Sequence, residues 1–153
     1  MFEGKVEAIA IRKVKSGAIE LTPTAAAEAE RGLVGDHAAA GLLPGMENEA
    51  GKQVTLIEAE ALEAVQQEKG YSITHLESRR NILTRGAPLN HLVGKRFRVG
   101  EVLLEGIRLC EPCSHLEKLT GKTLISPFLH RCGLRARIVE GGSLHVGDPI
   151  REA

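Results

Sequence analysis

The sequence predicts a mainly β (α+β) protein with one main helix, and three observations carry this prediction. Seventeen glycines separate many short apolar segments. Several of these segments alternate apolar and polar residues, which is the period of a strand with one buried face. Only one stretch shows the 3.6-residue period of an amphipathic helix. At 153 residues, the chain is expected to form one domain, residues 1–153, which buries about 68–70% of its unfolded surface.

The first part of the chain is expected to form a hairpin followed by a long loop. Apolar residues alternate over residues 5–12 and predict a strand, and Ser16-Gly17 predicts a turn. Residues 18–21 would then form the partner strand. Residues 23–51 contain TAAAEAE, GLVGDH and GLLPGMENEAG, which lack clean periodicity. We interpret them mostly as a long loop.

The main helix is predicted to follow the apolar run at residues 54–57. Ile57, Ala61, Leu62 and Val65 fall on one helical face, and Lys69-Gly70 supplies a cation and a stop signal at the end. A second, short helix is expected at residues 114–119, before Thr120-Gly121. Further strands are predicted at residues 81–84, 96–99, 102–107 and 134–139, the second and third of these joined by a tight turn. Gly141-Gly142 would turn the last strand, and the segment from Val146 to Pro149 would close the chain.

Composition excludes several classes of partner. Twenty basic and twenty acidic side chains cancel, and aromatic residues make up only 3% of the chain, so we expect no nucleic-acid partner. No apolar run of about eighteen residues is present, so we expect no membrane span. Charges in the first residues argue against a signal peptide. Three cysteines are too few for a disulfide framework, and a reduced, cytoplasmic location is expected.

The segment RLCEPCSH, residues 108–115, carries two of the three cysteines, and its chemistry can be interpreted in several ways. Cys110 and Cys113 have the spacing of half a zinc site, which His130 and Cys132 would have to complete. They also have the spacing of a thiol-redox pair between a strand and a helix. One cysteine could instead act alone as a soft thiolate for a metal or as a persulfide carrier. Finally, both could be small core residues.

Two other groups of residues have polar chemistry that suits ligand binding. The turn Gly35-Asp36-His37 combines a flexible backbone with an acceptor and an imidazole, although such a turn is commonly a structural corner. The segment Arg79-Arg80-Asn81 places two guanidinium groups beside a predicted strand, where they could recognise an anion. Arg131 begins a second basic group, which continues with Arg135 and Arg137 on one face of the last clear strand.

The order of these motifs resembles the MOSC domain, a module also found at the C-terminus of molybdenum cofactor sulfurases. The resemblance runs from about Gly32 to Ile150 through GLVGDHAAAG, RRNILTRG, LVGKRFRVGEVLLEGIRLCEPC and GLRARIVEGGSLHVGDPI. It implies a strongly bent, barrel-like sheet with a few helices in a small standalone form of the domain. It also implies binding of the molybdenum cofactor (molybdopterin), either as a sulfur carrier or as a small molybdenum-dependent reductase of N-hydroxylated compounds.

The resemblance also implies roles for individual residues. The family's cysteine in the "PC" segment, a molybdenum ligand or sulfur carrier, matches Cys113, and Cys110 is the second candidate. Arg79, Arg80 and Arg131 are then candidates to bind the pterin phosphate. Asn81 and the turn Gly35-Asp36-His37 could hydrogen-bond the pterin or order the loop around it. Partners would be the cofactor itself and proteins that make the cofactor or donate electrons.

This chain departs from the family pattern at three places. Many members have Glu-Asn where this chain has Arg80-Asn81, and a Gly-Gly pair where it has Arg131-Cys132-Gly133. Because of the second difference, the resemblance does not determine the conformation of the backbone turn at residues 131–133. The chain is also too short to carry the pyridoxal-phosphate domain of full sulfurases, so we expect no pyridoxal-phosphate site and no independent extraction of sulfur from cysteine.

Overall fold

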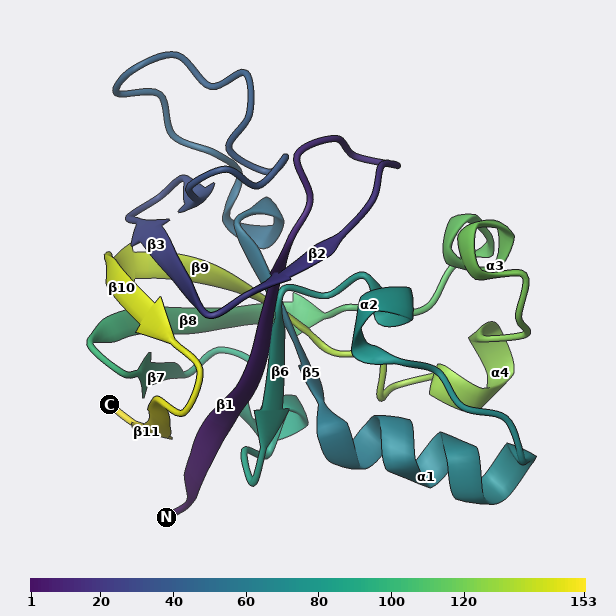
Figure 1. Ribbon diagram of the computed structural model, residues 1–153. Coiled ribbons are helices and arrows are strands. Elements are labelled where there is room, and N and C mark those ends of the chain that lie inside the picture. Colours follow the sequence, from purple (N-terminus) through teal and green to yellow (C-terminus); the bar gives the residue numbers. More distant parts are fainter.

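The computed structural model describes all residues 1–153 as strands, short helices and the loops between them (Figure 1). The strands are β1 (Glu3–Ile11), β2 (Glu20–Thr22), β3 (Thr24–Glu28), β4 (Gly32–Leu33), β5 (Val54–Glu58), β6 (Ile82–Arg85), β7 (Arg96–Val99), β8 (Val102–Leu109), β9 (Leu134–Glu140), β10 (Gly142–His145) and β11 (Pro149–Glu152). The helices are α1 (Ala59–Lys69), α2 (His75–Ser78), α3 (Ser114–Thr120) and α4 (Ile125–Phe128), with short 3-10 helices η1 (Ala50–Lys52) and η2 (Leu89–Leu92).

Seven strands close into a barrel in the order β11-β7-β8-β9-β5-β6-β1, because β11 pairs with β1 as well as with β7. All neighbouring strands in the ring are antiparallel except β5 and β6. Parallel strands need a crossover connection, which α1 and α2 supply here. The small sheet β10-β3-β4 is formed separately. The predicted mainly β, barrel-like architecture is therefore confirmed.

Strand β1 joins three parts of the molecule along its length. Its first residues pair with β11, its middle with β6, and Ile9–Ile11 with β2. The register with β6 shifts between Val6 and Ala8, and such an irregularity bends a strand and increases its twist. The predicted hairpin of β1 and β2 is present. The bend lets β1 close the barrel at one end and carry the loop that borders the candidate site at the other.

The interior of the barrel is filled by alternating side chains of its strands. Leu134, Ala136 and Ile138 are buried along β9, while the arginines between them are partly exposed. Phe97 of β7 and Leu104 of β8 belong to the same cluster of 19 buried residues. Burying large apolar side chains stabilises the fold by about 1.5–3 kcal/mol each. This cluster makes the barrel a rigid frame for the loops.

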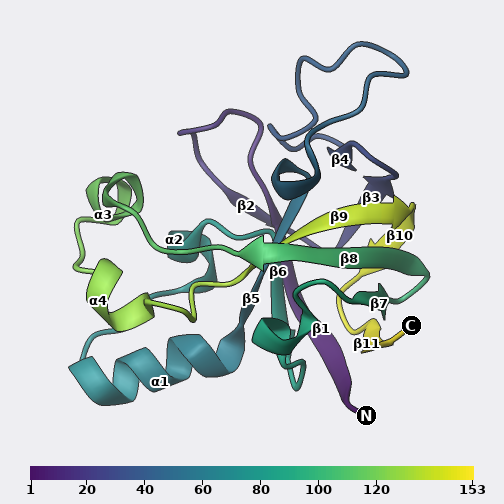
Figure 2. The same cartoon turned by 180° about the vertical axis from the view of Figure 1, so that it is seen from behind.

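The α-helices gather on one side of the barrel (Figure 2). A second apolar cluster of seven buried residues lies there and includes Val65 of α1, Leu116 of α3 and Phe128 of α4. Gly70 ends α1 in the left-handed conformation, with φ of 78°, as predicted from Lys69-Gly70. This layer holds α3, which follows the Cys110–Cys113 segment directly.

The structure differs in detail from two expectations about local structure. Residues 23–51 are mostly loop, as predicted, but the prediction missed β3 and β4, which lie within them. Strand β3 is rich in alanine, a weak strand former, and it is stabilised by pairing with β10, more than a hundred residues away. Ile57 belongs to buried strand β5 and not to the helix face, since α1 begins at Ala59.

Buried His75 predicts a loss of stability in acid. Its Nε2 donates to the carbonyl of Arg80 at 2.9 Å, and its Nδ1 is buried without a partner, so the ring is neutral. Burial holds the pKa of His75 below its ordinary value. A lowered pKa means that the folded state is most stable above about pH 6.5 and loses stability as the pH falls through the folded-state pKa. Urea unfolding at pH 7.5 and 5.0 should show this loss, and His75→Gln should reduce it; an equal loss in the variant would contradict the assignment.

Candidate functional site

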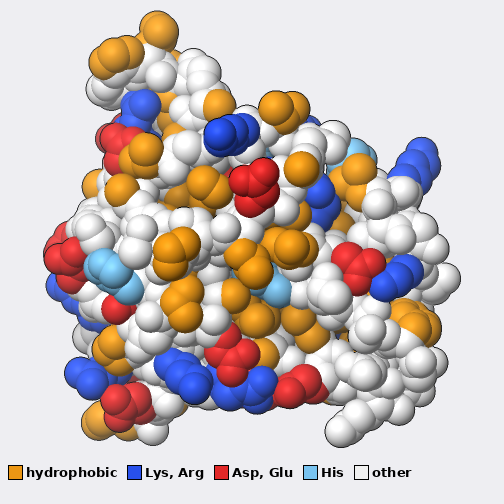
Figure 3. Space-filling view, in the orientation of Figure 1, with side chains coloured by type: hydrophobic (Ala, Val, Ile, Leu, Met, Phe, Trp, Pro, Cys, Tyr) orange, Lys and Arg blue, Asp and Glu red, His pale blue; other side chains and the backbone are white.

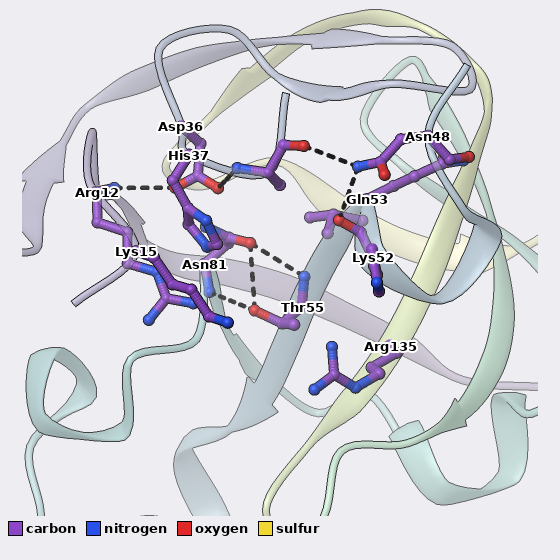
Figure 4. Close-up of a pocket in the computed structure, with 12 residues that line it drawn as sticks. Arg12, Lys15, Asp36, His37, Asn48, Lys52, Gln53, Thr55, Asn81 and Arg135 are labelled. Carbon is purple, nitrogen blue, oxygen red and sulfur yellow. Dashed lines mark hydrogen bonds between the residues drawn. The ribbon is translucent and has the colours of Figure 1, made fainter. Parts of the chain in front are cut away.

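The main polar pocket lies where the β1–β2 loop and residues 36–53 meet the exposed faces of β5 and β9 (Figure 4). Its volume is about 360 Å³. Only two of its lining residues are hydrophobic, so it is suited to a polar or charged ligand. The lining residues are Arg12, Lys15, Asp36, His37, Ala38, Asn48, Lys52, Gln53, Val54, Thr55, Asn81 and Arg135.

The buried amide of Asn81 organises the floor of this pocket. Its Oδ1 accepts from the backbone N–H and the hydroxyl of Thr55, at 3.1 and 3.2 Å. Its Nδ2 donates to the carbonyl of Ala10 at 3.1 Å and to Oδ1 of Asp36 at 3.3 Å. Asn81 therefore ties β1, β5 and the start of β6 to the Asp36 turn. Its hydrogen-bonding capacity is used within the protein, which makes it a positioning residue.

The Gly35-Asp36-His37 turn forms one wall of the pocket. Asp36 is buried, and its carboxylate accepts from the backbone N–H of Arg12 at 2.9 Å and that of Ala38 at 3.3 Å, in addition to Asn81. Gly35 has φ of 87°, a conformation that favours glycine. The backbone N–H of His37 donates to the carbonyl of Arg12 at 2.6 Å. These bonds fix the turn against β1 and leave the His37 ring in the pocket.

Four cations line the pocket, whereas Asp36 is its only carboxylate. The guanidinium group of Arg12 has no hydrogen bond or ion pair, and the Lys15 ammonium group has none. Arg135 donates to the carbonyl of Gly51 at 3.2 Å, and Lys52 forms an exposed ion pair with Glu49 at 3.4 Å. Elsewhere, on the face in Figure 3, basic and acidic side chains are interspersed. The pocket therefore concentrates positive charge in a protein of zero formal net charge.

The charged form of Arg12 is disfavoured by burial and by two neighbouring arginines that lie outside the pocket lining. Burial holds the pKa of Arg12 below its ordinary value, and the neighbouring Arg79 and Arg80 lower it further, whereas Asp36 opposes the shift. Arginine stays charged at neutral pH regardless. Such a group is stabilised when an anion enters and accepts its free N–H donors.

The three arginines predicted to bind an anion lie in three different environments. Arg79 donates to the carbonyls of Lys15 and Gly17, at 3.2 and 2.6 Å, so it supports the β1–β2 loop from outside the pocket lining. Arg80 is buried and donates to the carbonyl of Cys132 at 2.9 Å and to its sulfur at 3.1 Å. Arg131 pairs with Glu68 of α1, away from the pocket lining.

The three cysteines are also separated by environment. Cys110 and Cys132 are buried and Cys113 is exposed, and all three are free thiols. Burial raises the pKa of Cys132, an effect that Arg80 opposes. No three His, Cys, Asp or Glu side chains come together in a way that could hold a metal ion. The geometry thus gives no support to a zinc clip built on Cys110, Cys113 and Cys132, and it leaves Cys113 as the accessible thiol.

Cys113 lies at the N-cap position of α3, and its side chain makes no capping hydrogen bond. Two residues later, Nε2 of His115 lies 3.5 Å from the hydroxyl of Ser16 in the β1–β2 loop. The neighbouring Lys15 lines the pocket. The loop thus contacts both the pocket and the helix that begins next to Cys113.

Sequence reasoning missed several pocket residues. Arg12 and Lys15 follow a strand in a run of basic residues, a pattern that normally indicates a solvated loop. Arg135 was noted only as part of a basic stripe. The one available signal was the alternation on β9, which places Arg135 opposite the buried Leu134 and Ala136. Asn48 and Gln53 hold the loop through hydrogen bonds to backbone carbonyls and gave no signal at all.

The chain is thus a closed seven-stranded β-barrel protein with a cation-lined pocket and one exposed cysteine. The family model of the MOSC domain matches residues 35–151. This chain therefore belongs to the MOSC domain family. No curated protein matches its sequence.

Solved structures show the same fold. The YuaD protein from Bacillus subtilis is similar with a TM-score of 0.78 and 17% identity, over 98% of this chain and 97% of that one. YiiM from Geobacillus stearothermophilus has a TM-score of 0.68 and 12% identity, over 98% and 75% of the two chains. YiiM from Escherichia coli has a TM-score of 0.68 and 16% identity, over 100% and 70%. At these identities the comparison concerns the fold alone.

Proposed function

We propose that this MOSC domain protein binds the molybdenum cofactor, with the anionic pterin end in the pocket and Cys113 as the thiol partner of the metal. One observation carries the proposal: Arg12 and Lys15 present unpaired cationic groups in a pocket whose only carboxylate is already hydrogen-bonded. The site is therefore suited to an anion, and the terminal phosphate of the pterin is such a group.

The residues present fit this cofactor. Arg12, Lys15, Lys52 and Arg135 would hold the phosphate, because guanidinium groups donate paired N–H bonds to its oxygens. The exposed sulfur of Cys113 would approach the molybdenum, for which a soft thiolate is a suitable ligand. Bound molybdenum would supply redox and oxygen-atom chemistry, while the protein supplies the ligand, orientation and electrostatics.

The other residues predicted for the site would act indirectly, by positioning the residues that contact the ligand. Asn81 and Asp36 hold the floor and one wall, and Arg79 holds the β1–β2 loop that carries Lys15. Arg80 fixes the ends of β8 and β9 through the carbonyls of Cys110 and Cys132, and thereby positions the segment that leads to Cys113. We give Arg131 a structural role, because its guanidinium group binds Glu68 and the carbonyl of Pro127.

Two activities are consistent with such a site: transfer of sulfur to the cofactor by Cys113, or reduction of N-hydroxylated compounds at the retained metal. Either would need a partner, a cofactor-biosynthesis protein in the first case and an electron donor in the second. Three free thiols suit a reducing compartment, and we place the protein in the cytoplasm. No helix has the length and apolar character required to cross a bilayer.

Cofactor loading tests the proposal. The protein, purified from molybdate-supplied cells that make the cofactor, is expected to contain about one molybdenum per chain together with pterin phosphate. The measurements are elemental analysis and pterin fluorescence after oxidation. Retention of both after gel filtration would favour a reductase, and loss to an acceptor protein would favour a carrier. Zinc in place of molybdenum, or no metal and no pterin, would contradict cofactor binding.

A further inference from the structure

His37 is the one titratable group of the pocket whose charge can change near neutral pH. Its imidazole ring makes no hydrogen bond within the protein, whereas its backbone is fixed to the carbonyl of Arg12. Figure 4 shows the ring beside Arg12 and Lys15, on the pocket side of the turn. Both ring nitrogens are therefore available to a ligand.

The groups around His37 keep the ring neutral while the pocket contains no anion. Burial holds the pKa of His37 below its ordinary value, and Arg12 at the start of the β1–β2 loop, Lys15 of the same loop and Arg79 after α2 lower it further. Only Asp36, on the same turn, opposes them. Lys52 and Arg135 line the rest of the pocket and add positive charge.

A bound anion would reverse this balance. Its negative charge would offset the four lining cations and leave the imidazolium form of His37 with an attractive partner. The protonated ring would then donate a further hydrogen bond to the anion, and hydrogen bonds between charged groups are stronger than neutral ones. By linkage, a ligand that favours protonation binds more tightly as the pH falls.

We propose that anion binding in this pocket is coupled to protonation of His37, so that the pocket binds dianions in preference to monoanions and binds them more tightly below neutral pH. This inference rests on the proposed function, since it concerns the same pocket, and it specifies the charge of the group that the pocket accepts. The proton comes from solvent and is released when the anion leaves. His37 is thus a specificity-determining residue for the anionic end of the ligand.

Sulfate is the probe of choice because it remains a dianion from pH 5.5 to 8.5, whereas a phosphate monoester itself titrates near pH 6. Isothermal titration calorimetry in buffers with different heats of ionisation measures the dissociation constant and the number of protons taken up. For the wild-type protein we expect affinity to rise up to about tenfold between pH 8 and pH 5.5, the limit set by an upward shift of about one pKa unit in His37. Proton uptake should reach a maximum of about half a proton per sulfate within this range, because a shift of one unit separates the protonated fractions of the free and bound states by at most about one half.

His37→Gln keeps a polar side chain but removes the titration, so its sulfate affinity should not change with pH and no proton should be taken up. His91→Gln, at an exposed position outside the pocket, is the matched control and should behave as the wild type. Sulfate binding without proton uptake, or a pH dependence that survives in His37→Gln, would overturn the coupling and leave the pocket's anion role intact. Absence of sulfate binding at every pH would overturn both.

Discussion

Replacing Gly133 with alanine is expected to lower the free energy of unfolding by about 4 kcal/mol. Gly133 has φ of 116°, which side-chain-bearing residues rarely adopt, and an added Cβ would lie 2.2 Å from the carbonyl oxygen of Leu56 in β5. The clash is with the backbone of a barrel strand, so it cannot be relieved by moving a flexible side chain. For a protein of this size, about 4 kcal/mol corresponds to a fall in Tm of about 8–16 °C.

The measurement is urea unfolding followed by circular dichroism, with Gly121→Ala as control. Gly121 ends α3 with φ of 70°, but a Cβ there meets nothing within 4 Å. The free energy of unfolding of the control should therefore fall only by the cost of holding a residue with a side chain in the left-handed conformation, about 1–2 kcal/mol. Equal stability of the two variants would show that β5 does not approach Gly133 as closely as described.

Replacing both Arg12 and Arg135 with glutamine is expected to weaken sulfate binding about a hundredfold. Each guanidinium group would make a charge-assisted contact with the anion, worth about 1.5–3 kcal/mol, and about 1.4 kcal/mol corresponds to tenfold in affinity. Glutamine retains much of the length of the arginine side chain and one donor group. We therefore take the lower value, about 1.5 kcal/mol, as the loss at each of the two positions. Because neither arginine has an ion-pair partner in the protein, the fold should lose little stability.

Calorimetric titration with sulfate at pH 6 measures this change. Arg151→Gln is the control, since Arg151 is exposed on β11, pairs with Glu3 and lines no part of the pocket. The wild type and the control should bind alike. An affinity of the double variant within about threefold of the wild type would show that the anion binds elsewhere or through backbone groups alone.

The mainly β character could be predicted from local sequence patterns such as the strict alternation of β9, whereas the barrel was implied by the family resemblance. Leu134, Ala136 and Ile138 identify β9 without any knowledge of its neighbours. The small sheet could not be predicted, because the alanines of β3 have little preference for a strand and are held there by β10. This sheet forms only because two segments far apart in the sequence pair with each other, and the local periodicity of the sequence does not reveal such pairing.

The candidate site was predictable only in part, for a similar reason. The motif order drew attention to Asp36, His37 and Asn81, and the structure brings these three residues together in one pocket. Arginine side chains are long, however, and their direction depends on the tertiary partner that each one finds. Arg80 turns inward to the carbonyl of Cys132, and Arg131 turns to Glu68 on α1. Arg12, by contrast, has no protein partner, and only the folded structure reveals this.

The most direct test of a molybdenum site at Cys113 is the molybdenum content of Cys113→Ser, measured beside the wild type after expression in molybdate-supplied, cofactor-competent cells. Serine preserves size and exposure but removes the soft sulfur ligand. Cys110→Ser is the matched control, because it changes a buried thiol three positions away. We predict about one molybdenum per chain in the wild type and in Cys110→Ser, and a loss of most of the metal in Cys113→Ser. Full molybdenum content in Cys113→Ser would contradict the assignment of Cys113 as the metal's protein ligand.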